Sequence, residues 1–464
     1  MAHSNPADRR GLLGARAQAV ESRPADPVGL RTRRRVMRRF LPFLIVAYLL
    51  AYVDRANLGV AKLQMQGDLH FTDRTVGLGA GIFFLGYFLL EIPGSLIVER
   101  YSARKWFARI MIAWGLVATL TGWIGMPWTT SLSSRQQFYL ARFLLGAAEA
   151  GFFPGVIVYL SHWFRSEDRT RAKSWFMMTQ PLAIVVGTPL SRWILENVHL
   201  YGLPGWRWVF LLEGMPSIVL GIVALFYLTD RVHQARWLRE DEREWLSAEL
   251  AREEREKIAA GRVRILDAFR QPQTVLLLAV LFLIVTSNQA LLFFLPSMAD
   301  NLGGMSVTGR TIIAAVPYLF SIVGILLNGF LSSRSGERRW HTAGPILATG
   351  VSLVALILAG SHVALMVALL CVVGLTFQAW LPVFWTLPTA FLGQSAAATA
   401  IGTINSFGNL GGLAGPYVFG YLKTATGGYE TGLWFLAGCM LMSGLLATQI
   451  RVKHAQNQIH EEKT

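Results

Sequence analysis

The chain of 464 residues combines 53% hydrophobic with only 15% charged residues, a balance that excludes an ordinary soluble protein. Its net charge of +15 comes from short basic segments between apolar runs, which is typical of membrane loops and argues against a nucleic-acid partner. The two cysteines, Cys371 and Cys439, both lie inside apolar runs, so we expect neither a disulfide nor a metal site. The composition therefore indicates a polytopic membrane protein.

Residues 1–39 are polar and rich in arginine, without the apolar core and cleavage site of a signal peptide, so we expect a disordered tail. Apolar runs of about 20 residues follow, each long enough to cross a bilayer. They predict twelve membrane-spanning helices at 40–63, 76–98, 106–126, 138–163, 175–195, 208–228, 275–298, 312–331, 343–360, 364–387, 397–422 and 433–450.

The distribution of basic residues predicts the orientation and the domain boundaries. The arginine-rich loops fall on the same side as the N-terminus, so the positive-inside rule places both termini in the cytoplasm of a bacterial cell, with the spans in its inner membrane. A charged linker at 230–272 separates two six-helix halves at 40–229 and 273–451, and a second tail covers 452–464. The apolar positions of the linker predict an amphipathic helix on the inner membrane surface.

An internal repeat supports the division into two halves. Residues 95–105 follow the second span and residues 329–339 follow the eighth, and the two segments share basic positions. The loop resembles that of the major facilitator superfamily, which implies an all-α fold of two pseudo-symmetric halves, working as a monomer. The resemblance also implies a cytoplasmic gate loop formed by Glu99, Arg100, Arg104, Arg334 and Arg338.

Three further stretches carry a finer resemblance. Residues 52–57, 142–155 and 404–412 together are similar to the anion:cation symporter family, and residues 235–238 and 385–388 are similar to its tartrate, phthalate and aromatic-acid branch. This family takes up small organic anions, mostly with protons. The resemblance also implies substrate-lining roles for Tyr52, Tyr87, Gln180 and Asn405, although packing is an alternative role for the last three.

The charged residues within the spans predict the site without reference to a family. An ionisable side chain in hydrocarbon costs about 3 kcal/mol and usually faces a polar cavity, which singles out Asp54 and Arg55 in the first span. Arg142 and Glu149 in the fourth span are seven residues apart and therefore share one helix face. We expect Arg55 and Arg142 to bind the substrate carboxylate, and Asp54 and Glu149 to bind the coupled proton. The alternative is that Asp54 and Arg55 only fix helix packing.

The C-terminal half contributes neutral groups. If the first, fourth, seventh and tenth spans hold equivalent positions around a central site, then Asn288, Gln289, Gln378 and Trp385 line it. Glu91, Glu213 and Arg192 lie toward helix ends and are expected to be structural.

The predicted function is proton-coupled symport of a small organic anion, with the proton as the coupled ion and no cofactor. A second transporter hypothesis is antiport that exports a drug or metabolite. A third hypothesis, a membrane enzyme or sensor, lacks a His/Asp or Cys/His cluster in the sequence, and no nucleotide-binding loop is present.

Overall fold

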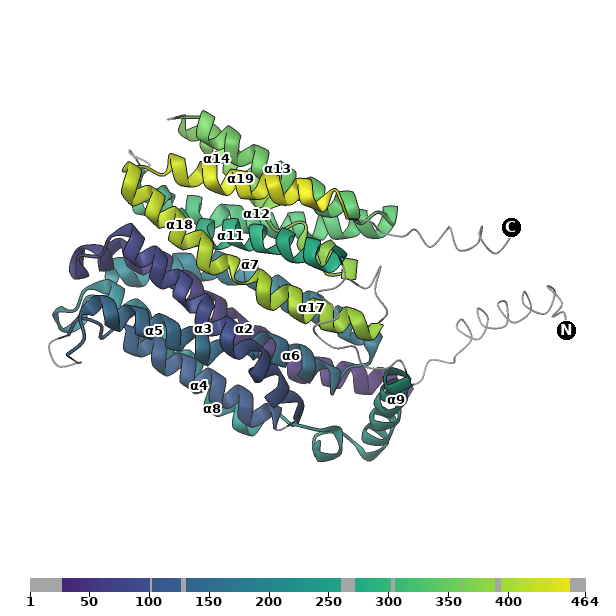
Figure 1. Cartoon of the computed structure of the whole chain (residues 1–464). Coiled ribbons are helices and arrows are strands. Elements are labelled where there is room, and N and C mark those ends of the chain that lie inside the picture. The colour runs from purple at the N-terminus through teal and green to yellow at the C-terminus, as the bar shows by residue number, and fades with distance from the viewer. Residues whose placement is uncertain are drawn as a thin grey trace, which may run out of the picture.

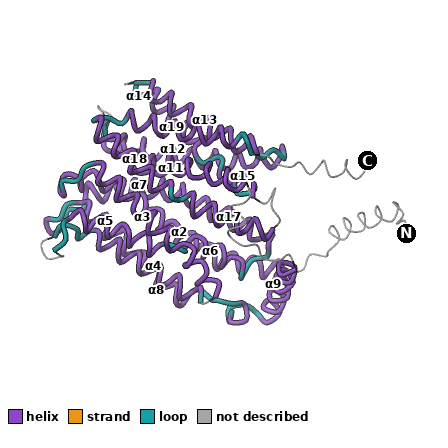
Figure 2. Tube along the Cα trace, viewed as in Figure 1, coloured by secondary structure: helices purple, strands orange, loops and turns teal. Residues whose placement is uncertain are grey.

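The computed structural model describes residues 27–100, 102–126, 131–259, 272–301, 305–360, 362–388 and 394–450. These residues form helices joined by loops (Figure 2). The first half comprises α2 (Pro27–Leu69), α3 (Asp73–Arg100), α4 (Ala103–Thr121), α5 (Ser134–Glu149), α6 (Phe152–Ser161), α7 (Ser166–Asn197), η1 (Leu200–Gly202) and α8 (Gly205–Tyr227). The linker contains η2 (Val232–Gln234) and α9 (Glu240–Ala259). The second half comprises α11 (Pro272–Asp300), α12 (Val307–Ser335), α13 (Arg339–Leu358), α14 (Val363–Phe377), α15 (Leu381–Phe384), α17 (Gln394–Gly408), α18 (Gly411–Thr426) and α19 (Glu430–Ala447).

The two halves lie side by side, with α2–α8 in one and α11–α19 in the other (Figure 1). They meet where α3 packs on α18, α7 on α12 and α2 on α11. We call the end of the bundle that carries α9 and the first residues of α2 the linker end, and the opposite end the far end (Figure 1).

The helices coincide with the predicted spans. Within the described residues, nine helical segments are long and apolar enough to cross a membrane, and α4, α7 and the α17–α18 pair occupy the other three predicted spans. The predicted span at 138–163 is two helices rather than one, because Gly151 adopts a left-handed conformation (φ 84°) between α5 and α6. The predicted spans at 364–387 and 397–422 are likewise divided.

The N-terminal tail and the linker differ from expectation. The disordered tail predicted for residues 1–39 is wrong from Pro27 onward, because α2 begins there. Arg33 of this extension donates to Asp168 of α7, and Arg31 donates to the buried Glu242 of α9 at 2.8 Å. The linker helix α9 buries Leu246 in the core of the first half, so its apolar side packs on protein.

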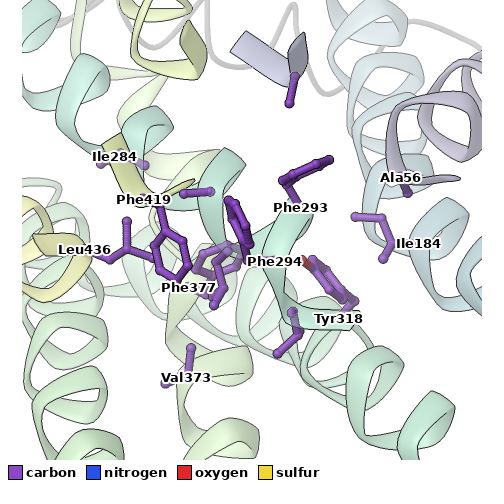
Figure 3. Close-up of a cluster of buried hydrophobic side chains, with 14 of the residues drawn as sticks. Ala56, Ile184, Ile284, Phe293, Phe294, Tyr318, Val373, Phe377, Phe419 and Leu436 are labelled. Atoms are coloured by element: carbon purple, nitrogen blue, oxygen red, sulfur yellow. The ribbon is translucent and has the colours of Figure 1, made fainter. Parts of the chain in front are cut away.

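A shared core joins the halves near the far end. Figure 3 shows Phe293 and Phe294 of α11 among side chains of the second half, with Ala56 and Ile184 of the first half beside them. The ring of Phe294 stacks on Phe419 of α18 at 4.4 Å between centroids. The cluster as a whole contains buried residues of α2 and α7 as well as of the second half, and so joins the two halves.

Candidate functional site

The charged site is built where α2, α3 and α5 pack together. A close approach of α3 and α5 depends on Gly146, since a Cβ atom there would lie 1.9 Å from the backbone oxygen of Phe83. Only a residue without a side chain fits such a contact. This packing brings the predicted residues of α5 against those of α2.

Arg55 and Glu149 form a buried ion pair between α2 and α5. The Arg55 Nε atom donates to Glu149 Oε1 at 2.8 Å, and Glu149 is only 2% exposed. The Arg55 guanidinium carbon lies 5.0 Å from the ring centroid of Tyr52 and 5.1 Å from that of Tyr87. The two tyrosines therefore hold the guanidinium by cation–π contacts while Glu149 neutralises it.

Arg142 lies beside this pair but is less fully bonded. It is buried, and its Nε and Nη1 atoms have no hydrogen-bond partner. Its guanidinium lies 5.1 Å from the ring centroid of Phe83, and its charge interacts with those of Asp54 and Glu149. A buried N–H group without a partner is energetically unfavourable. The unpaired donors of Arg142 would therefore gain from binding a carboxylate.

Asp54 is also buried and only partly bonded. Its Oδ1 atom accepts from Asn57 Nδ2 at 3.3 Å, whereas its Oδ2 atom has no partner. Glu213 of α8 interacts with the same Asn57 and accepts from Ser191 at 2.7 Å. Asp54 and Glu149 thus share one buried region of the first half with Arg55 and Arg142, and the carboxyl group of Glu213 interacts with Asp54 at its edge.

The remaining predicted lining residues are less closely connected to this cluster. Asn288 Oδ1 and Gln378 Oε1 are buried without a hydrogen-bond partner, which suits residues that face a substrate path. Gln289 and Trp385 are half-buried, and no interaction between described residues ties them to the charged cluster. Gln180, also half-buried, lies one turn from Phe176, whose ring stacks on Tyr48 at 4.1 Å.

Asn405 makes a contact that the sequence did not indicate. It donates from Nδ2 to Glu91 of α3 at 2.6 Å, which joins α17 of the second half to the first half. The charge of Glu91 also interacts with that of Arg55. Glu91 is therefore part of the contact between the halves as well as of its own helix.

The predicted gate loop is described only in part. The side chains of Glu99 and Arg100 lie outside the described residues. The backbone N–H of Arg104 donates to Asp230 at 2.8 Å, Arg334 is exposed, and Arg338 donates to the backbone oxygen of Thr386. In this structure, the described contacts of the loop stay within each half.

Contacts at the far end were also missed from the sequence. Lys423 of α18 pairs with Asp73 of α3 at 3.0 Å, and Arg192 of α7 pairs with Asp300 of α11 at 2.8 Å. Lys62 of α2 is fully buried, and its ammonium nitrogen lies 3.7 Å from the ring centroid of Phe294 and has no hydrogen-bond partner. These contacts hold the two halves together at the far end.

A bundle of two similar halves with a buried, partly unpaired charge cluster is the architecture of a secondary membrane transporter. The sequence model described as Major Facilitator Superfamily matches residues 44–416 and also 277–462. The chain therefore belongs to the major facilitator superfamily. This membership confirms the predicted fold class and the prediction of a transporter rather than an enzyme.

Known relatives agree with this membership over nearly the whole chain. A protein of Agrobacterium vitis named "Putative tartrate transporter" is 41% identical over 416 residues, covering 90% of this chain and 94% of that protein. The "Quinolone resistance transporter" of Acinetobacter baumannii is 38% identical, covering 90% of this chain and 94% of that protein. The solved structure of the xylose transporter XylE from E. coli covers 90% of this chain and 99% of its own with a TM-score of 0.72, but at 11% identity it supports the fold alone. The tartrate relative confirms the predicted branch.

Proposed function

We propose that the protein imports a small organic anion, a hydroxy acid such as tartrate or an aromatic carboxylate, together with protons. In this proposal it works as a monomer in the bacterial inner membrane, with the linker end in the cytoplasm. The observation that carries the proposal is the buried Arg142 guanidinium, which has unpaired N–H groups beside the Arg55–Glu149 ion pair. The name of the Agrobacterium vitis relative supports the substrate class.

The substrate carboxylate binds between the two arginines. The N–H groups of Arg142 that have no partner donate to one carboxylate oxygen, and Arg55 turns from Glu149 to donate to the other. Once Glu149 loses its partner it is a buried, unpaired carboxylate, which is unstable in its charged form. It therefore takes up a proton as the anion binds.

Charge balance determines how many protons accompany the anion. Asp54, Glu149, Arg55 and Arg142 are neutral as a group, so each negative charge of the substrate requires one proton if the loaded cluster is to stay neutral. Glu149 supplies the first site, and Asp54, with its unpaired Oδ2 atom, supplies the second. A dianion such as tartrate is therefore carried with two protons, and net transport moves no charge.

Residues around the cluster determine which anion fits. Tyr52 and Tyr87 keep Arg55 in place, while the amides of Gln180, Asn288, Gln289 and Gln378 provide neutral partners for substrate hydroxyls. Trp385 offers one flat apolar wall, which favours aromatic acids. The gate-loop residues Glu99, Arg100, Arg104, Arg334 and Arg338 close the linker end in the opposite conformation.

Export by proton antiport is the second candidate, because one relative is named a quinolone resistance transporter. An antiporter of this kind binds its drug when the proton leaves. The paired arginines favour anions over cationic drugs, and so favour import.

Uptake by the purified protein in liposomes distinguishes the two functions. Radiolabelled hydroxy, sugar and aromatic acids are tested with and without an inward proton gradient, and with a membrane potential of either sign. Accumulation of one acid that depends on the gradient and not on the potential is the expected result. Gradient-driven export of quinolones without uptake of any acid would establish the antiporter instead.

A further inference from the structure

A basic cavity lies at the linker end, away from the transport site. It has a volume of about 740 Å³ and lies between the first turns of α2, the last residue of α8 and the start of the linker. Its lining consists of Pro27, Leu30, Arg31, Arg34, Arg35, Arg38, Arg39, Tyr227 and Trp237. Of these five arginines, only Arg31 makes a contact described above.

The acidic groups of the linker neutralise only part of this charge. Asp241 and Glu242 pair with Arg31, and Glu242 also pairs with Arg35 at 2.7 Å. Arg34 and Arg38 are exposed and make no ion pair with any described residue. The lining therefore keeps an excess of positive charge that is open to an anion.

Arg39 marks the depth of the cavity relative to the membrane. Its guanidinium carbon lies 4.7 Å from the ring centroid of Tyr227 and 4.9 Å from that of Trp237, and its Nε atom is buried without a hydrogen-bond partner. The next residue, Phe40, begins the apolar span. Tyrosine and tryptophan are typical of the interface between headgroups and hydrocarbon, so the cavity lies at that level.

An apolar surface leads away from the cavity along α8. Val219, Ile222 and Phe226 are exposed at helical spacing and so form one stripe, and Phe226, next to Tyr227, is 83% exposed. A molecule with an anionic head in the cavity can therefore lay an acyl chain along this stripe. Free phosphate and soluble anions have no acyl chain that could cover this stripe.

We propose that this cavity binds the phosphate headgroup of an anionic phospholipid. The assignment depends on charge complementarity and on the interfacial position of the cavity, and it is independent of which substrate is carried or in which direction. Basic pockets between transmembrane helices are a known means of binding such headgroups. The bound lipid bridges α2, α8 and the linker, and stabilises the junction that Arg31 and Glu242 already make.

Native mass spectrometry of the full-length protein in detergent tests this assignment with phosphatidylglycerol, phosphatidylcholine and inorganic phosphate as separate probes. The variant R34Q/R38Q removes two exposed, unpaired charges and should leave folding unchanged, which its thermal unfolding without lipid verifies. The matched control R252Q/R255Q removes two exposed arginines of α9 at the same end of the molecule, neither of which lines the cavity.

The expected result is retention of phosphatidylglycerol but not phosphatidylcholine by the unmodified protein, and about 30-fold weaker retention by R34Q/R38Q. The control variant retains the lipid as the unmodified protein does. Equal retention of both lipids by the unmodified protein, or equal losses in the two variants, would overturn the proposal. Displacement of phosphatidylglycerol by inorganic phosphate at millimolar concentration would also overturn it, because the site would then be one for a free anion.

Discussion

Replacing Glu149 by glutamine should separate net uptake from exchange. In the variant the empty cluster holds Asp54, Arg55 and Arg142 and so carries one positive charge. An anion therefore needs one proton fewer than in the unmodified protein to make the loaded cluster neutral. The loaded form stays neutral and crosses normally. The empty form has to return with a buried, uncompensated charge.

The size of the effect follows from the burial of the pair. Glu149 is 2% exposed and bonds Arg55 at 2.8 Å, and removing one partner of a buried ion pair costs about 3–5 kcal/mol. Glutamine keeps an oxygen that can accept the hydrogen bond, so we take the lower value. A penalty of about 3 kcal/mol on the return step slows net uptake about 100-fold.

Two assays in liposomes measure the two processes. Net uptake is followed under an inward proton gradient, and counterflow is followed in liposomes preloaded with unlabelled substrate. We expect Glu149→Gln to lose the first and keep the second, while Glu244→Gln on the exposed side of α9 keeps both. Unchanged net uptake would refute the role of Glu149 in proton coupling, and loss of both processes would place it in substrate binding instead.

Three further substitutions examine other parts of the structure. Arg142→Gln removes the unpaired donors and should abolish stabilisation by substrate in thermal unfolding, whereas stabilisation equal to that of the unmodified protein would exclude Arg142 as a ligand. Asp73→Asn breaks the pair with Lys423 and should speed alkylation of a Ser297→Cys probe on α11 by a membrane-impermeant maleimide in a cysteine-free background; an unchanged rate would mean that the pair does not hold the far end closed. Glu242→Gln should lower stability by about 1–2 kcal/mol, measured as a lower Tm, because its arginine partners are more than a third exposed and solvent screens the pairs; no shift would mean that the linker junction contributes nothing.

The sequence predicted the site residues of the first half better than their partners. Asp54 and Arg55 stand out because a charged side chain inside an apolar run is energetically costly and usually has a function. The spacing of Arg142 and Glu149 placed both on one face, and the structure buries both. That Arg55 pairs with Glu149 rather than with Asp54 depends on how α2 and α5 are rotated against each other, which no single helix encodes.

Lys62 and Glu91 make contacts that the sequence analysis missed. Lys62 is the second-last residue of its predicted span, where a lysine normally extends to the interface, yet α11 covers it with Phe293 and Phe294. Glu91 precedes a proline, which suggested a structural role, and its partner Asn405 lies more than three hundred residues further along the chain. Such contacts arise from the packing of the two halves, which cannot be predicted from the composition and periodicity of a single span.

The described ion pairs that join the two halves lie at the far end. At the far end the pairs Asp73–Lys423 and Arg192–Asp300 join the two halves. At the linker end, the ion pairs between described residues connect α2, α7 and α9, and none of them reaches the second half.

In an alternating-access cycle the far-end contacts separate, so the pairs Asp73–Lys423 and Arg192–Asp300 open and Lys62 loses its covering rings. Each opened pair exposes one acid and one base, whereas Lys62, which has no hydrogen-bond partner, adds a net positive charge. In the proposed import cycle, an anion that enters from the far end meets Lys62 before it reaches Arg55 and Arg142. Lys62 then has two roles in that cycle, since it packs on Phe293 and Phe294 when the far end is closed and attracts the anion when it opens.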